Sequence, residues 1–166
     1  MPDHPQQADL ESLLEALCRA GVAFIVVGGA AAVLHGAPVT TQDVDIVPRV
    51  DADNIARLMA LLDQLDARVR DVAGRDIKPE PTGLLGTGQT KLTTRRGPLD
   101  VLGALHDGRG YSDLLPHTEE LTDGTLRLRV LDLKTLIDIK SGTGRIRDQL
   151  VLPLLLALAR KREQDG

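Results

Sequence analysis

A hydrophobic run that ends in two glycines most constrains what this chain can fold into. Residues 23–27 read AFIVV, the composition of a buried β-strand, and Gly28-Gly29 follow directly. Residues 30–35 read AAAVLH and are expected to form a short helix. At such a strand-to-helix turn, glycine lets backbone N–H groups approach a phosphate because no Cβ stands in the way. A plain turn between a strand and a helix also favours glycine, so both interpretations stay open at this point.

A second predicted strand, within residues 40–50, has one acidic face. Val44 and Ile46 alternate with Asp43 and Asp45, and residues two apart on a strand point to the same side. The two carboxylates would repel each other and raise each other's pKa. A divalent cation that prefers oxygen ligands, such as Mg²⁺, would remove that cost. An Asp-x-Asp pattern alone is more often a solvated strand edge, so its context decides.

A third carboxylate supplies part of that context. Residues 89–94 and 99–105 are predicted to form a hairpin around the turn 95–98. Asp100 lies on the second of these strands among apolar residues, and a half-buried carboxylate needs a partner. If this strand lies beside the one that carries Asp43 and Asp45, three carboxylates converge. That is the minimum set for two metal ions that flank a transferring phosphoryl group.

The remaining pattern indicates an α/β (α+β) fold. We expect a mixed sheet of about five strands, flanked by helices, with a helical segment at the C-terminus. Asp51 or Asp53 is expected to cap the third helix, residues 79–88 are expected to be loop, and Pro153 should kink or divide the last helix. Beyond the segments already named, helices are predicted at 9–20, from the cap to 65, at 132–141 and at 145–161, and a further strand at 125–131.

Four segments together carry a family resemblance. In combination they resemble the DNA polymerase β-type nucleotidyltransferase superfamily, and more closely its small bacterial branch, the AbiEii-type toxins and related minimal nucleotidyltransferases. The resemblance implies a single domain, 1–166, with a nucleotidyltransferase-like core at 22–131 and C-terminal helices at 132–162 packed on it. The segments are VVGGAAAVLHGAP (26–38), TTQDVDI (40–46), LDVL (99–102) and LDLKTLIDIKSGTGRIRDQLVLPLL (131–155).

The resemblance also implies an activity and a set of site residues. The activity is transfer of a nucleoside monophosphate from an NTP to an acceptor hydroxyl. Asp43, Asp45 and Asp100 are implied as catalytic residues and as ligands of Mg²⁺, with two ions expected and Mn²⁺ as an alternative. For Lys140 and Asp148, a packed surface lysine and a helix-surface acid are the competing interpretations. Nucleotide contacts are implied at Gly28, Gly29, Thr41, Lys140, Arg145 and Asp148.

The acceptor is left open by the resemblance. It could be RNA or tRNA, a protein or a small molecule such as an antibiotic, and the chain could be one component of a toxin–antitoxin pair with a cognate partner protein. Arg95, Arg96, Arg127 and Arg129 would form a basic rim if they share a face. A net charge of −4, with one Phe, one Tyr and no Trp, does not favour a general RNA binder. The same scarcity of aromatic residues predicts a core of Leu, Val, Ile and Ala.

Val39 departs from the family pattern, because the small branch often carries an arginine there. Its absence supports an alternative function, a catalytically inactive nucleotidyltransferase-fold partner such as an antitoxin or a regulatory subunit, whereas the three acids oppose it. A third interpretation treats the acids as surface decoration. Thr41 remains, and its hydroxyl could orient Asp43 or a phosphate.

Other signals are weaker. GLLGTGQTK (83–91) lacks the lysine position of a phosphate-binding P-loop, although it could cover a substrate as a mobile loop. His35 is expected to pack on its short helix. Cys18 is the only cysteine, which excludes an internal disulfide. The N-terminus does not read as a signal peptide, and the apolar run 150–159 is too short to cross a bilayer, so a cytoplasmic protein with no membrane partner is expected.

Overall fold

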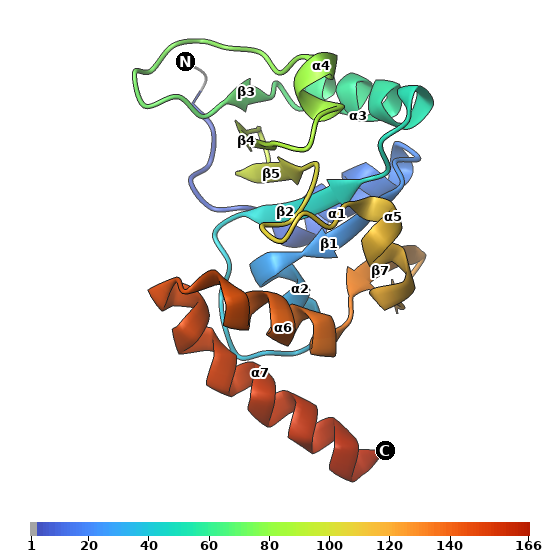
Figure 1. The fold of residues 1–166 in the computed structure, drawn as a ribbon. Coiled ribbons are helices and arrows are strands. Elements are labelled where there is room, and N and C mark those ends of the chain that lie inside the picture. Colours follow the sequence, from blue (N-terminus) through green and yellow to red (C-terminus); the bar gives the residue numbers. More distant parts are fainter. Residues whose placement is uncertain (1–2) are drawn as a thin grey trace.

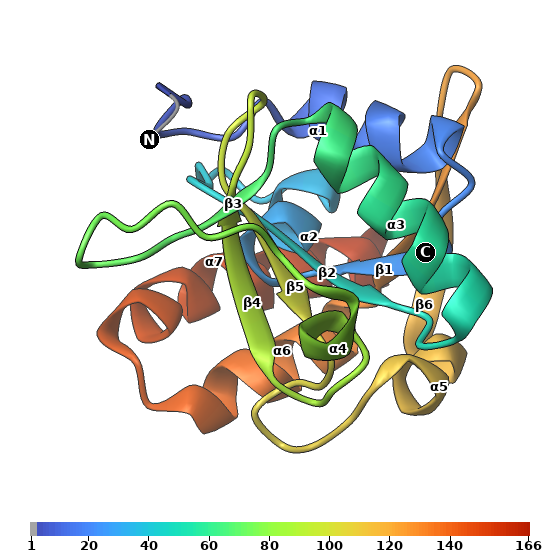
Figure 2. The same cartoon turned by 90° about the horizontal axis from the view of Figure 1, so that it is seen from above.

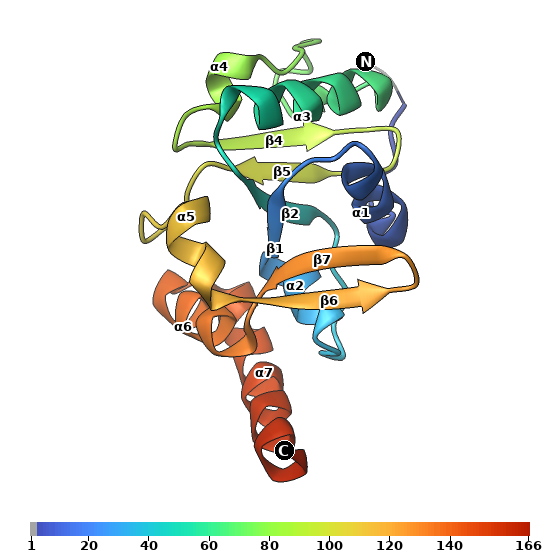
Figure 3. The same cartoon turned by 90° about the vertical axis from the view of Figure 1, so that its right-hand side faces the viewer.

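The computed structural model describes residues 3–166, and a mixed sheet forms its centre. The sheet has seven strands in the order β3-β4-β5-β2-β1-β7-β6. Figure 3 shows most of this order from top to bottom. β1 is antiparallel to β2 and parallel to β7, and β2 is parallel to β5. The strands are β1 Phe24–Val27, β2 Val44–Pro48, β3 Arg68–Val69, β4 Gln89–Thr93, β5 Leu99–Leu102, β6 Thr118–Asp123 and β7 Leu126–Leu131.

Two of these strands were not predicted, so the expected number of about five was too low. β3 is only two residues long, which leaves no alternation to detect. β6 reads TEELTD and contains residue types that are depleted in strands. Each unpredicted strand pairs antiparallel with an edge that the sheet already offers, β3 with β4 and β6 with β7. Pairing, rather than local propensity, therefore creates both.

Helices cover both sides of the sheet. α1 and α3 lie on one side and α6 on the other (Figures 1 and 2). α7 packs on α6, and its C-terminal part extends away from the sheet in Figure 1. The helices are α1 Leu10–Arg19, α2 Gly28–Leu34, α3 Ala52–Gln64, α4 Pro81–Leu84, α5 Tyr111–Leu114, α6 Leu133–Thr143 and α7 Ile146–Asp165, with a 3₁₀ turn, η1, at Leu115–His117.

Three local predictions are settled by these bounds. Asp51, not Asp53, is the N-cap of α3, because its side chain accepts a hydrogen bond from Asn54 N at 2.9 Å. Residues 79–88 are not all loop, since the one-turn helix α4 begins at Pro81, a position where proline costs no hydrogen bond. Pro153 does not divide the last helix, and α7 runs through it without interruption.

The core is aliphatic, as the composition predicted. Among the described residues, Phe24 is the only aromatic member of the buried hydrophobic core, and the largest fully buried side chains are leucines and isoleucines. His35 is buried and packs at the end of α2, where Nε2 lies 2.7 Å from Leu131 O. Arg162 of α7 donates to His35, so this arginine makes a tertiary contact and is not simply a solvated cation at the C-terminal end of a helix. Within the described residues, no helix is long and apolar enough to cross a membrane.

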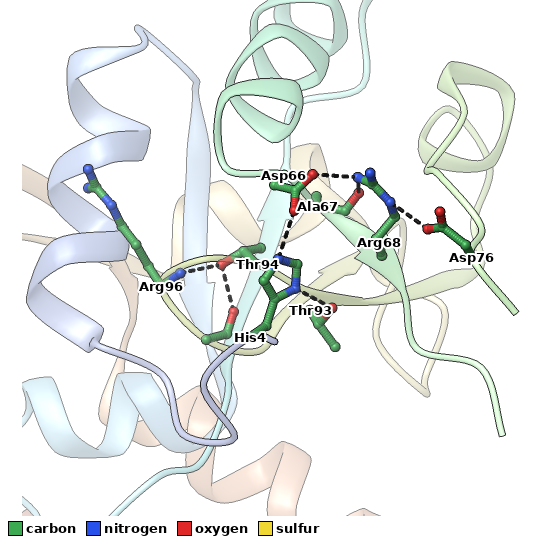
Figure 4. A network of polar contacts seen from close by, with 9 residues as sticks. His4, Asp66, Ala67, Arg68, Asp76, Thr93, Thr94 and Arg96 are labelled. Atoms are coloured by element: carbon green, nitrogen blue, oxygen red, sulfur yellow. Dashed lines mark hydrogen bonds and ion pairs between the residues drawn. The ribbon is translucent and has the colours of Figure 1, made fainter. Parts of the chain in front are cut away.

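A polar network fixes the outer edge of the sheet at β3 (Figure 4). Arg68 bridges Asp66 at 3.0 Å and Asp76 at 2.6 Å. His4 from the N-terminal segment contacts Thr93 Oγ1 at 2.8 Å and Asp66 Oδ2 at 3.2 Å. These contacts join three separate parts of the chain, and they hold β3 against β4 immediately before Arg70.

Candidate functional site

Three aspartates converge at the centre of the sheet. Asp45 on β2 and Asp100 on β5 are directly paired in the register of these parallel strands, and Asp43 immediately precedes β2. One carboxylate oxygen from each lies within 4.8 Å of the other two. The strand adjacency on which the predicted metal site depended is therefore present in the structure.

The environment of Asp45 is unfavourable for a charged carboxylate. Burial, and then the negative charge of Asp43, raise the pKa of Asp45 to about 7, although Lys140 and Arg70 act in the opposite direction. Asp45 Oδ1 is buried and has no hydrogen-bond partner among the described residues. Two like charges about 4 Å apart repel by about 4 kcal/mol at an effective dielectric constant of about 20. Hard oxygen donors with an unpaired buried atom fit a divalent cation such as Mg²⁺ or Mn²⁺.

Gly28 and Gly29 are required by close packing against the acidic residues. Gly28 has φ of +65°, and a Cβ there would contact the Asp45 carboxylate. A Cβ on Gly29 would lie 2.8 Å from Thr41 Oγ1. Thr41 Oγ1 in turn donates to Asp43 O at 2.8 Å, which fixes the backbone that carries this acid. The double glycine therefore lets the start of α2 pack directly against Asp45 and against Thr41, the residue that fixes the backbone of Asp43.

Lys140 and Asp148 form a buried ion pair between α6 and α7. Lys140 Nζ lies 3.1 Å from Asp148 Oδ1, and Thr143 Oγ1 donates to Asp148 Oδ2 at 2.6 Å. Burial raises the pKa of Asp148, but the hydrogen bonds from Thr143 and Lys140 outweigh it, so the pKa lies below its usual value. Both side chains are buried, which excludes the surface interpretations of these two residues.

A cleft of about 660 Å³ brings the predicted site residues together. Asp43 and Asp45 line it, as do Gly28, Gly29, Thr41, Lys140, Arg145 and Asp148. Val39 lies on the wall where the family pattern often has arginine, and Arg147, which sequence reasoning had not assigned to the site, also lines the cleft. Thr87 and Gln89 place one end of the glycine-rich segment at the same cleft. Asp100 is not among the lining residues.

Arg70 is a second residue of this site that sequence reasoning missed. It follows β3, and its Nη1 lies 3.7 Å from Asp43 Oδ2 while its Nη2 contacts Asp100 Oδ1. Nothing in the sequence around Arg70 indicates this role. The role becomes visible only in the strand pairing. The short, unpredicted strand β3 pairs with β4, and this places Arg70 on the face of the sheet that carries Asp100.

The predicted basic rim does not form at the cleft. Arg96 donates to Ser12 O of α1 at 2.9 Å, and Arg129 lies 3.7 Å from Glu120 on β6. Neither of them, nor Arg95 or Arg127, is among the residues that line the cleft. The cations at the cleft come instead from α6 and the start of α7.

No family profile and no curated protein sequence matches the chain. Solved structures do match it. The lincosamide antibiotic adenylyltransferase LnuA, solved with lincomycin, superimposes with a TM-score of 0.64 at 14% identity, over 93% of this chain and 99% of that chain. ANT(2")-Ia, solved with adenylyl-2"-tobramycin, gives 0.54 at 14% identity, over 95% and 97%.

A third structure points the same way. An antigenic nucleotidyltransferase-like protein from Paracoccidioides brasiliensis gives a TM-score of 0.55 at 15% identity, over 90% of this chain and 72% of that chain. At these identities the likeness is one of fold. The chain therefore has a nucleotidyltransferase-like fold, a mixed sheet flanked by helices with a helical C-terminus.

Proposed function

We propose that this protein is a divalent-metal-dependent nucleotidyltransferase that transfers a nucleoside monophosphate from an NTP to an acceptor hydroxyl. The observation that carries the proposal is the convergence of Asp43, Asp45 and Asp100 within 4.8 Å on a nucleotidyltransferase-like fold. Two of the three open onto a cleft with a volume in the range of small-molecule sites. An inert scaffold would have no reason to keep three converging acids at a cost in stability.

The residues divide the chemistry between them. The acceptor oxygen attacks the α-phosphorus, the bond between the α-phosphorus and its bridging oxygen breaks, and pyrophosphate leaves. Asp43 and Asp45 would hold the cation, which would neutralise phosphate charge and lower the pKa of the acceptor hydroxyl. Asp100 does not line the cleft, so it would accept the proton of that hydroxyl through water. Gly28 and Gly29 let the backbone approach the triphosphate.

Cations on the cleft wall support the triphosphate. Lys140 is held by Asp148 and lowers the pKa of Asp45, so its charge acts at the acidic site. Arg145 and Arg147 line the same cleft from the start of α7. We propose that these side chains bind phosphate oxygens, and that Arg147 compensates for the neutral Val39.

The acceptor that we favour is a hydroxylated small molecule. The cleft is lined by both polar and apolar side chains, and the arginines expected to attract RNA lie elsewhere. LnuA and ANT(2")-Ia, which were solved with lincomycin and with an adenylylated tobramycin, match almost their whole length to this chain. This supports an acceptor of antibiotic size over RNA or a partner protein.

Labelled nucleotide transfer tests the proposal. Each α-³²P NTP would be incubated with Mg²⁺ and, separately, with lincosamides and aminoglycosides, bacterial RNA, or cell protein. Asp45→Asn is the variant expected to be inactive. Asp138→Asn makes the same change at an exposed acid on α6 and should keep full activity. Label in the small-molecule fraction that Asp45→Asn abolishes supports the proposal. Label in RNA or protein would support nucleotidyltransferase activity but would replace the small-molecule acceptor by a toxin-type acceptor.

Val39 favours one second candidate, a catalytically inactive partner that binds nucleotide without turnover. Val39 lies on the cleft wall, where it offers a phosphate no charge. Metal-dependent NTP binding without transfer to any acceptor would support this candidate. Transfer that appears in Val39→Arg would then identify the lost arginine as the reason.

A further inference from the structure

We propose that Arg70 takes the place of a second divalent cation in the acidic site, so that the nucleotide-free protein binds one such ion and loss of Arg70 opens a second position. The inference rests on the metal centre of the proposed function.

Arg70, directly after β3, begins a row of charged residues that continues across β4, β5 and β2. Val69 pairs with Leu92 across β3 and β4. One residue further along, Arg70 N donates a hydrogen bond to Lys91 O at 2.8 Å, so Arg70 lies opposite Lys91. Lys91 pairs with Asp100 across β4 and β5, and Asp100 pairs with Asp45 across β5 and β2. Because residues paired across strands point to the same face, two cations and two acids follow one another on one side of the sheet.

The guanidinium of Arg70 spans two of the three carboxylates, those of Asp43 and Asp100. Its Nη1 faces Asp43 Oδ2 at 3.7 Å, and its Nη2 contacts Asp100 Oδ1. The Asp100 side chain is only 6% exposed, and no part of it lines the cleft. Arg70 therefore neutralises the most buried of the three acids, and Arg70 itself is not among the residues that line the cleft.

Asp45 has no ion-pair partner among the described residues, whereas Arg70 contacts both Asp43 and Asp100. Its Oδ1 is buried without a hydrogen-bond partner among the described residues, and its side chain lines the cleft beside Asp43. One divalent ion held by Asp43 and Asp45 is thus compatible with Arg70 in its position, whereas an ion between Asp43 and Asp100 is not.

The position of Arg70 is built into the edge of the sheet. Its backbone is bonded to Lys91, and the preceding strand is held by Arg68, Asp66 and His4 (Figure 4). An arginine on a free loop could swing away from an incoming ion at little cost. Here the backbone of Arg70 is itself hydrogen-bonded to β4, so an incoming ion could displace the guanidinium only by rotation of the side chain.

Counting bound Mn²⁺ tests the inference without measuring activity. Mn²⁺ would be titrated into the nucleotide-free protein, and the free ion would be measured by electron paramagnetic resonance. We expect about one Mn²⁺ per chain for the wild type and about two for Arg70→Met, which keeps the apolar stem but loses the charge. Arg75→Ala is the control, since Arg75 pairs with Asp71 in the exposed loop after β3 and touches none of the three acids.

Thermal melting with and without Mn²⁺ shows that each variant is folded and gives a second readout. Arg70→Met should melt lower than the wild type without metal and should gain more from Mn²⁺, because two ions stabilise more than one. Two Mn²⁺ in the wild type, or equal stoichiometry in the wild type and Arg70→Met, would overturn the role of Arg70 while the metal centre stands. Binding of no Mn²⁺ by either protein would overturn the metal centre of the proposed function, and the inference with it.

Discussion

Asp45 and Asp100 face each other in register on the neighbouring parallel strands β2 and β5. The pair is far apart in the sequence, and the hairpin of β4 and β5 brings it together by placing β5 beside β2. Two carboxylates fixed on rigid strands cannot relax away from each other, so the sheet itself maintains their repulsion. A site of this kind is prepared for a cation before the cation arrives, which is what catalysis by positioning requires.

Removing either acid of this pair should abolish transfer. Asp45→Asn and Asp100→Asn each delete a charge that the chemistry needs, one from the metal ligands and one from the proton acceptor. We expect the transfer rate to fall at least about a hundredfold in each variant. Steady-state assays with the labelled NTP measure this, and circular dichroism checks the fold. Near-wild-type rates in either variant would contradict the assignment, and Asp138→Asn should be unaffected.

The charge of Asp45 should make the metal-free protein less stable as pH rises. The pKa of Asp45 is about 7 in the folded protein and near 3.8 when unfolded, so the folded state binds the extra proton between these values. Its stabilising contribution is complete below the unfolded pKa and is lost as pH rises through about 7.

Asp45→Asn removes this dependence. In EDTA, the free energy of unfolding of the wild type should fall between pH 5 and 8 by on the order of 2 kcal/mol more than that of Asp45→Asn. Urea unfolding at the two pH values measures the difference. Excess Mg²⁺ should restore the wild type at pH 8 and leave the variant nearly unchanged. A wild type whose stability is the same at both pH values would contradict the prediction.

The sequence could predict the acidic triad because its evidence is local. Alternation around Asp43 and Asp45 fixes their common face, and apolar neighbours indicate that Asp100 is half buried. Whether the two strands are neighbours is a property of the whole sheet, and here the resemblance supplied what periodicity could not. Arg70 shows the limit, since its role depends on a two-residue strand and on pairing across β4.

Burial of Lys140 was equally hard to predict. The helical spacing of α6 is compatible with a surface lysine or with a buried one, and only the packing of α7 decides between them. Asp148 reaches Lys140 because the chain reverses at Gly144, whose φ of +69° ends α6 in the left-handed conformation.

Breaking the Lys140–Asp148 pair should cost stability as well as activity. Lys140→Met leaves the Asp148 carboxylate buried with one donor fewer, and uncompensated buried charges typically cost about 3–5 kcal/mol. The double variant Lys140→Met/Asp148→Leu removes both charges, and it should be more stable than the sum of the single changes predicts. Urea unfolding of the four proteins measures the coupling. Lys134→Met, an exposed change on the same helix, should have little effect, and strict additivity would contradict the pairing.

A methyl group at Gly28 should damage the site through two separate effects. Gly28 has φ of +65°, where any other L-residue is strained by about 1–2 kcal/mol. Its Cβ would also contact the Asp45 carboxylate, which would have to move. Gly108→Ala separates the two effects, because Gly108 has φ of +91° but no atom within 4 Å of a built Cβ. Both variants should lose similar stability from strain, but only Gly28→Ala should also bind Mn²⁺ more weakly. Equal Mn²⁺ affinity in the two would mean that Gly28 serves the turn alone, and that the close contact with Asp45 has no part in shaping the metal site.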